Sequence, residues 1–214
     1  MIMYIPAHFA ADQDTVVELL TNLGAADLIT VTDNGMDATF LPLLFDASRG
    51  EHGALLGHVA RNNEQWKRPA IGDALVIAHG ANGYVSPSYY AEKAEHGRVV
   101  PTWNYLTLHV YGTLVVHDDP DWVRSLVERL TEKHESEREH PWAVSDAPAD
   151  YIAGQLRAIV GIELLIKRIE AKAKFSQNRS AADVDGVVAG LSRDGFDEHA
   201  QAVRQAREKR RPAR

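Results

Sequence analysis

The stretch V-P-T-W-N-Y-L-T-L-H-V-Y-G, residues Val100 to Gly112, decides the fold of this chain. Its β-branched and aromatic residues are typical of a β-strand, in which side chains alternate between two faces. One face then carries Trp103, Tyr105, Thr107, His109 and Tyr111. The other face, from Asn104 to Val110, is mostly aliphatic and belongs in a core. The aromatic face suits a half-solvated cleft for a planar ligand, or a sheet surface that a helix or a second subunit covers.

The composition is that of an ordinary globular chain of 214 residues, 45% hydrophobic and 25% charged. No apolar run reaches the roughly 20 residues that cross a bilayer, and no export signal is visible at the start. The absence of cysteine excludes disulfides, thiolate metal sites and cysteine nucleophiles. The formal charge of −7 argues against a general nucleic-acid-binding surface, so DNA binding is doubtful. We expect a cytoplasmic protein without a membrane segment.

Turn signals and apolar patterns divide the chain into strands and helices. Asp33-Asn34-Gly35 predicts a tight hairpin turn. Pro42, in the return strand, removes a ladder donor, which indicates an edge, a bulge or a close ligand. Residues 80–83, G-A-N-G, predict a turn, and the charged residues 91–98 a mobile loop. The predicted strands cover 27–32, 37–46, 54–59, 74–79, 100–116 and 159–169, and the predicted helices begin near Asp12, Pro120, Pro148 and Ser180.

Antiparallel strands with hairpin turns and peripheral helices favour a β-barrel with α additions. The alternation of strands and helices that a parallel doubly wound sheet needs is absent. No internal repeat or low-complexity linker divides the sequence. We therefore expect a single domain over residues 1–214, with a helical C-terminal extension over about 180–214.

Two segments carry groups that bind phosphate. In G-H-V-A-R-N-N-E-Q-W, residues 57–66, a strand ends where a short helix begins. Free backbone donors would converge there with Arg61, and the alternative is a capped helix with a solvated arginine. In K-A-K-F-S-Q-N-R, residues 172–179, cationic and polar side chains could clamp a phosphate or a ribityl chain. The alternative for this segment is a solvated loop before the helix at Ser180.

Catalytic and metal motifs are missing from the sequence. His58, His79, His109 and His117 fall on predicted strands, without the paired spacing of a zinc site. The chain has no G-x-S-x-G elbow, P-loop or G-x-G-x-x-G fingerprint. The basic tail at 204–214 is only a weak nucleic-acid signal. We expect no metal site and name no catalytic residue.

Several blocks, in order along nearly the whole chain, resemble the PaiB family, described as FMN-binding negative transcriptional regulators. They are M-Y-I-P at 3–6, L-P at 41–42, G-H-x-A-x-x-N-x-x-W at 57–66, Y-V-S-P-S-Y-Y at 84–90, V-P-T-W-N-Y-x-x-x-H-x-Y-G at 100–112 and K-F-S-Q-N-R at 174–179. The fourth block departs from the family pattern S-x-S-W-Y, because Tyr89 stands in place of tryptophan. An aromatic ring is kept at this position.

The resemblance implies a mainly β fold with α additions, a split β-barrel of the pyridoxamine-phosphate-oxidase and flavin-reductase type with peripheral helices. It also implies a homodimer that binds FMN in clefts at the subunit interface. Residues 39–42 would run along the flavin ring, 58–63 would receive the phosphate, and 174–179 would close the cleft that Trp103 and Tyr105 wall. The residues expected to bind FMN are Thr39, Leu41, Pro42, His58, Arg61, Asn62, Asn63, Trp66, Trp103, Tyr105, Lys174, Ser176, Gln177 and Arg179.

The residues and the resemblance leave three functions open. The protein is a negative transcriptional regulator or flavin-based sensor, an FMN-dependent oxidoreductase for a small substrate, or a haem-binding protein of the same fold. The sequence shows no helix-turn-helix signature, which also argues against direct DNA contact. Any electron transfer would be carried by the flavin, with the protein supplying position and electrostatics.

Overall fold

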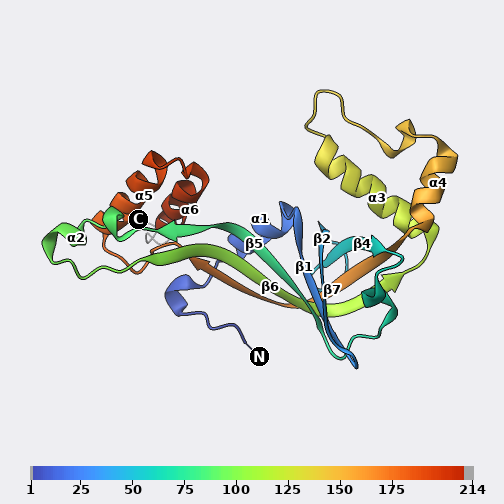
Figure 1. Cartoon of the computed structure of the whole chain (residues 1–214), viewed down its shortest axis with the longest axis horizontal. Coiled ribbons are helices and arrows are strands. Elements are labelled where there is room, and N and C mark those ends of the chain that lie inside the picture. Colours follow the sequence, from blue (N-terminus) through green and yellow to red (C-terminus); the bar gives the residue numbers. More distant parts are fainter. Residues whose placement is uncertain (1, 210–214) are drawn as a thin grey trace. The chain divides into compact units, whose positions relative to one another are not determined.

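The computed structural model describes residues 2–209, so residues 210–214 of the basic tail lie outside the described range. Contacts within the chain group it into two compact units (Figure 1). The first unit comprises Met1–Val16, His79–Leu108 and Glu170–Arg214, and the second comprises Val17–Ala78 and His109–Ile169. The strands that continue from one unit into the other are β5 (Ala74–Val85), β6 (Thr102–His117) and β7 (Ile159–Lys174). That the chain acts as a single domain stays a prediction.

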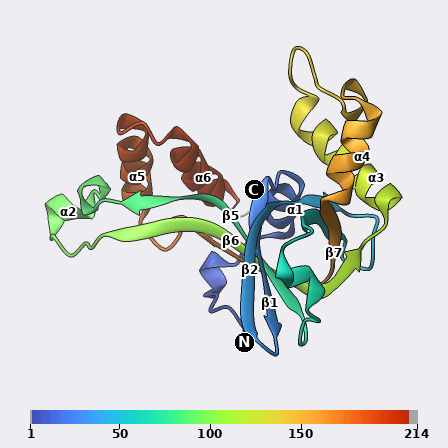
Figure 2. The ribbon, with the colours of Figure 1, turned by 45° about the vertical axis from the view of Figure 1, so that its right-hand side comes forward.

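The second unit is built on an antiparallel sheet with the strand order β2-β1-β5-β6-β7-β4-β3. Strands β1 (Ala25–Thr32) and β2 (Gly35–Pro42) form the predicted hairpin, side by side in Figure 2. Gly35 has a φ of 111°, which glycine adopts without strain. Pro42 is the last residue of β2, an edge strand, as the missing ladder donor predicts. The return strand is shorter than predicted, because β3 (Leu44–Asp46) pairs separately with β4 (Ala54–Ala60).

Two helices complete the core of the second unit. Leu126 and Leu130 of α3 (Pro120–Glu135) pack against Leu56 of β4. Val123 of α3 packs against Ile152 and Leu156 of α4 (Ala149–Arg157). The mainly β class with helical additions is therefore confirmed. In the described part of the chain, no helix has the length and apolar character to span a membrane.

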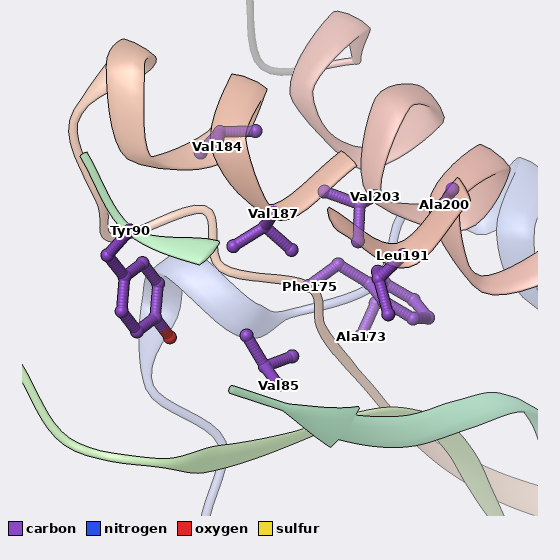
Figure 3. Close-up of a cluster of buried hydrophobic side chains, with 9 residues drawn as sticks. All are labelled: Val85, Tyr90, Ala173, Phe175, Val184, Val187, Leu191, Ala200 and Val203. Carbon is purple, nitrogen blue, oxygen red and sulfur yellow. The ribbon is translucent and has the colours of Figure 1, made fainter. Parts of the chain in front are cut away.

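The first unit has a hydrophobic core of its own, between strand ends and the helices α5 (Ala181–Arg193) and α6 (Asp197–Glu208) (Figure 3). Its buried side chains are Val85, Tyr90, Ala173, Phe175, Val184, Val187, Leu191, Ala200 and Val203. Ser180 caps α5 by accepting the N–H of Asp183 at 3.3 Å. Asp183 in turn accepts the N–H of Glu92 at 3.0 Å, which fastens the short helix α2 (Glu92–Glu95) to α5 in a segment that was predicted to be a loop.

The prediction of a turn at Gly80 to Gly83 is wrong, because β5 runs through these residues. Neither glycine has a positive φ, and both instead permit close approach. A Cβ on Gly80 would lie 2.9 Å from Leu106 Cδ2, and one on Gly83 would lie 2.7 Å from His199 Nδ1. Strand β7 also extends past residue 169 to Lys174, so Lys174 is a strand residue and not part of a turn. The remaining elements are η1 (Ala7–Phe9), α1 (Gln13–Thr21), η2 (Glu64–Lys67), η3 (Pro87–Tyr89) and η4 (Val144–Asp146).

Tyr89, where the family pattern has tryptophan, packs against α5 in the first unit. Gly186 and Gly190 make room for it, because a Cβ on Gly186 would overlap the Tyr89 carbonyl oxygen and a Cβ on Gly190 would overlap the Tyr89 ring. The Tyr89 hydroxyl donates a hydrogen bond to Asp194 Oδ2 at 2.5 Å. The side chain therefore fastens η3 to α5.

Candidate functional site

A polar network joins β2 to η2 in the second unit, which contains the predicted residues from Thr39 to Trp66. The Thr39 hydroxyl donates to Gln65 Oε1 at 2.5 Å and accepts from Asn63 Nδ2 at 2.9 Å. Gln65 is only 4% exposed and donates to the Leu28 carbonyl of β1. Asn63 also accepts the Gln65 N–H at 2.8 Å and so caps η2. Thr39 and Asn63 therefore have fixed positions within this unit.

The predicted helix start after β4 is too small for a strong anion site. η2 is a single turn of 3-10 helix with Glu64 in its first turn, and a carboxylate beside those donors disfavours an anion. Asn62 is exposed. The Trp66 indole donates to the Arg61 carbonyl at 3.0 Å, which closes the loop between β4 and η2.

Leu41 and Pro42 lie against the strand that carries His58. A Cβ on Gly57 would lie 3.1 Å from Leu41 Cδ1 and 3.0 Å from the Pro42 carbonyl oxygen, so glycine permits this contact. The His58 ring is half-buried, and its Nδ1 has no hydrogen-bond partner among the described residues. Burial lowers the pKa of His58, which favours a neutral imidazole.

Arg61 is engaged by partners inside the second unit. Its Nη2 and Nη1 donate to the two carboxylate oxygens of Asp118 at 2.5 and 3.0 Å. Its Nε donates to the Arg157 carbonyl at 2.7 Å, and Nη2 also donates to the Ile159 carbonyl at 3.2 Å. The hydrogen bond from Arg61 lowers the pKa of Asp118. A phosphate on Arg61 would have to displace Asp118, so this pair argues against the predicted phosphate contact.

The first unit contains a cation cluster, which is formed by Lys172, Lys174 and Arg179. Lys174 Nζ donates to Thr102 Oγ1 at 2.5 Å and to the Trp103 carbonyl at 2.7 Å, both neutral acceptors. Burial lowers the pKa of Lys174, and the charges of Lys172 and Arg179 lower it further. No carboxylate of the described chain forms an ion pair with a member of the cluster. The cluster therefore holds positive charge without an internal counter-charge.

Aromatic rings border the cation cluster. The ring centroid of Tyr105 lies 5.5 Å from Lys172 Nζ and 6.0 Å from Lys174 Nζ. Trp103 is 51% exposed, and its ring centroid lies 6.5 Å from that of Tyr84. On the opposite face of β6 Asn104, Leu108 and Val110 are fully buried, as the alternation predicts, whereas Thr107 on the aromatic face is buried as well.

Ser176 and Gln177 hold the turn that carries Arg179. Ser176 has a φ of 65°, a left-handed conformation that is uncommon outside glycine. Its hydroxyl accepts a buried hydrogen bond from Asn104 Nδ2 at 3.2 Å. Gln177 accepts the Phe175 N–H at 2.6 Å and donates to the Ala173 carbonyl at 2.7 Å. Each of these side chains has a partner within the chain.

Three residues of these networks were not predicted individually from the sequence: Gln65, Asp118 and Lys172. Gln65 and Lys172 lie inside segments that the sequence had singled out, 57–66 and 172–179, so a signal was present. Asp118 gave none, because its role depends on a partner far away in the sequence: Asp118 and Arg61 are separated by 57 positions.

The sequence of the chain matches a known protein family. A family model described as "Putative FMN-binding domain" matches residues 3–168. The protease synthase and sporulation protein PAI 2 of Bacillus subtilis (strain 168) is 30% identical over 194 residues, which cover 90% of each chain. The chain belongs to the PaiB family of FMN-binding proteins. FMN is the cofactor of this PaiB-like protein.

Two solved structures share the fold of this PaiB-like chain. The flavocytochrome Anf3 from Azotobacter vinelandii superimposes with a TM-score of 0.52 at 15% identity, over 76% of this chain and 67% of its own. The FAD and heme binding protein from Mycobacterium smegmatis superimposes with a TM-score of 0.54 at 17% identity, over 84% and 78% of the two chains. These likenesses confirm the split-barrel fold.

Proposed function

We propose that the cation cluster and its neighbouring rings hold FMN. The observation that carries this proposal is the charge of Lys172, Lys174 and Arg179, which no described carboxylate neutralises. A phosphate dianion supplies the missing counter-charge and is bound best by charged donors. The flavin ring is flat and largely apolar, which suits the faces of Tyr105 and the exposed Trp103. The residues present therefore fit the cofactor.

Within this proposal the predicted residues have different tasks. Lys174 and Arg179 receive the phosphate, and Ser176 and Gln177 hold the turn that presents Arg179. Arg61 becomes a positioning residue, because its donors are engaged by Asp118 and backbone carbonyls. The other residues predicted to bind FMN belong to the second unit, and for them cofactor binding stays a separate prediction: Thr39, Leu41, Pro42, His58, Asn62, Asn63 and Trp66. Bound FMN would supply any electron transfer.

We also propose that the protein works as a homodimer, as a cytoplasmic flavin-based sensor or negative transcriptional regulator. Met36 and Phe40 on the edge strand β2 are 79% and 70% exposed. Large apolar side chains grouped on an exposed edge support a second copy of the chain as partner. The alternative, an FMN-dependent oxidoreductase for a small substrate, predicts steady-state oxidation of a nicotinamide cofactor by the loaded protein, which a sensor does not require.

Haem binding is a second candidate function, and His58 is the residue that favours it. The buried Nδ1 of His58 lacks a partner among the described residues, and a neutral imidazole is the form that coordinates iron. Of the two similar structures, one is named a flavocytochrome and the other a FAD and heme binding protein. An absorption spectrum of the purified protein distinguishes haem from flavin. A haem spectrum that His58→Ala abolishes would establish this alternative.

The test of FMN binding compares FMN with riboflavin, which lacks the phosphate. We expect the wild-type protein to bind FMN more tightly than riboflavin in a fluorescence titration. Lys174→Gln and Arg179→Gln should each weaken FMN binding about tenfold or more, the usual effect of removing a charged contact, and leave riboflavin binding nearly unchanged. Arg124→Gln, on α3 of the second unit, is the matched control. Equal affinities for FMN and riboflavin would contradict the proposed phosphate site.

A further inference from the structure

The N-terminal segment of the chain is tied to β7 in the first unit. The N–H of Met3 donates to Glu170 Oε2 at 2.8 Å. Further along, Ala10 forms an antiparallel bridge with Lys172, and the N–H of Ala11 donates to the Ala171 carbonyl at 3.3 Å. These contacts on both sides of Tyr4 and the following residues fix this segment beside the strand that carries the cation cluster.

Tyr4 and Tyr105 both lie near one cation. Lys172 Nζ is 5.5 Å from the ring centroid of Tyr4 and 5.5 Å from that of Tyr105, within the range of cation–π attraction. Tyr4 is nevertheless 81% exposed. Its ring therefore lies beside the Lys172 ammonium group and leaves most of its surface uncovered, and Lys172 forms no ion pair with a carboxylate of the described residues.

This arrangement has the properties of a stacking surface. A fixed aromatic ring offers contact area at little cost in conformational entropy, and neighbouring cations attract an electron-rich edge. The flavin ring system combines a flat aromatic surface with carbonyl oxygens along one edge. Tyr4 and Tyr105 offer the aromatic surface, and the ammonium group of Lys172 is a donor for the carbonyl edge.

We propose that Tyr4 is a further ligand-binding residue, which stacks with the flavin ring while Lys172 binds the polar edge of that ring. The inference rests on the proposed function and extends it, because it assigns the N-terminal segment to the ring and leaves the phosphate to Lys174 and Arg179. Ring recognition and phosphate recognition are then separable by mutation.

The test uses the full chain, with riboflavin and FMN as the two ligands. Tyr4→Ala should weaken the binding of both ligands by the same factor, about tenfold, as is usual for the loss of one stacking ring. Tyr4→Phe keeps the ring and should bind both ligands like the wild type. Tyr151→Ala, which removes a 58% exposed tyrosine from α4 of the second unit, is the control for general effects. Circular dichroism should show the same thermal unfolding for all variants, because Tyr4 is exposed.

The outcomes separate this inference from the proposed function. If the wild type binds FMN and Tyr4→Ala binds both ligands equally well, Tyr4 is not a ligand contact, although the proposed function stands. If Tyr4→Ala weakens FMN binding alone, Tyr4 acts on the phosphate and the inference is overturned. If the wild type binds neither ligand, the proposed function falls, and this inference falls with it.

Discussion

The carboxylate of Asp118 holds the guanidinium of Arg61 in a two-point pair, with oxygen–nitrogen distances of 2.5 and 3.0 Å. Arg61 also donates to backbone carbonyls of Arg157 and Ile159, so it ties the end of β4 to the region between α4 and β7. Arg61→Ala should therefore lower the midpoint of thermal unfolding and change FMN affinity by less than about twofold. Arg124→Ala is the control. A loss of FMN affinity with unchanged unfolding would restore Arg61 as a phosphate contact.

Gly186 and Gly154 both lie inside helices, but only Gly186 is closely packed against another part of the chain. Alanine at position 186 would overlap the Tyr89 carbonyl oxygen, whereas at position 154 the nearest atom is 3.9 Å away. Gly186→Ala should destabilise the fold by about 1–3 kcal/mol, because the overlap outweighs the better helix propensity of alanine. Gly154→Ala should stabilise it by up to about 1 kcal/mol. Urea unfolding measures both changes, and a stabilising Gly186→Ala would contradict the packing described for Tyr89.

Asp46 should make the stability of the protein depend on acidic pH. The Ser48 hydroxyl, which donates to Asp46 Oδ1 at 2.6 Å, lowers the pKa of Asp46 from 3.8 to about 2, with a further contribution from Arg129. Because the pKa is lower in the folded state, this stabilisation is complete above pH 3.8 and is lost as the pH falls toward 2. Solvent screening limits its size to about 1 kcal/mol.

The measurement is the free energy of unfolding against pH for wild type, Asp46→Asn and the control Asp33→Asn, an exposed residue of the hairpin turn. Asp46→Asn should flatten the profile below pH 4, and Asp33→Asn should follow the wild type. A profile of Asp46→Asn parallel to that of the wild type would show that the pair with Ser48 carries no net stabilisation.

The exposed apolar edge of β2 should be a contact between two copies of the chain. Phe40 is 70% exposed in the single chain and would be buried in such a contact. A glutamate there would bring an unpaired charge into an apolar interface, which is costly. Phe40→Glu should shift the mass measured by light scattering from dimer to monomer, whereas Phe196→Glu, at a 58% exposed position of the first unit, should not. An obligate interface buries on the order of 2,000 Å² or more. A wild-type monomer at micromolar concentration would end the homodimer proposal.

Specific DNA binding by the isolated protein should be weak. Phosphate contacts need clustered positive charge, whereas the chain carries a net charge of −7 and its cation cluster is proposed to hold FMN. The other concentration of positive charge is the tail at 204–214. A gel-shift experiment at physiological salt tests this with the full chain and with a chain ending at residue 208, which keeps α6 and removes the tail cations at positions 209, 210, 211 and 214. A tight, sequence-selective shift that survives the truncation would contradict the prediction.

The sequence predicted the strands well where two local signals agreed. The hairpin of β1 and β2 combines alternating side chains with an Asn-Gly turn, and both are properties of adjacent residues. The prediction at Gly80 to Gly83 was wrong because glycine occurs both in turns and where another group packs closely against the backbone. Only the packing of Leu106 and His199 shows that these glycines serve close packing.

The candidate site was predicted less well than the fold, because side-chain partners are not local. Residue types identified Arg61 and Lys174 equally as phosphate ligands. The fold gives Arg61 a carboxylate partner, Asp118, and gives Lys174 only neutral acceptors and like charges. Composition cannot distinguish a neutralised cation from an unneutralised one, since the difference depends on residues that the folded chain brings together.

The contact of Tyr89 with α5 has a consequence for homologous sequences. Because Gly186 and Gly190 leave the space that Tyr89 occupies, positions 89, 186 and 190 should vary as a set during evolution. Homologues with a large ring at position 89 should keep small residues at both glycine positions. Homologues with tryptophan at position 89 lack the hydroxyl that Asp194 accepts, so they should lose the acidic residue at position 194 more often than those with tyrosine.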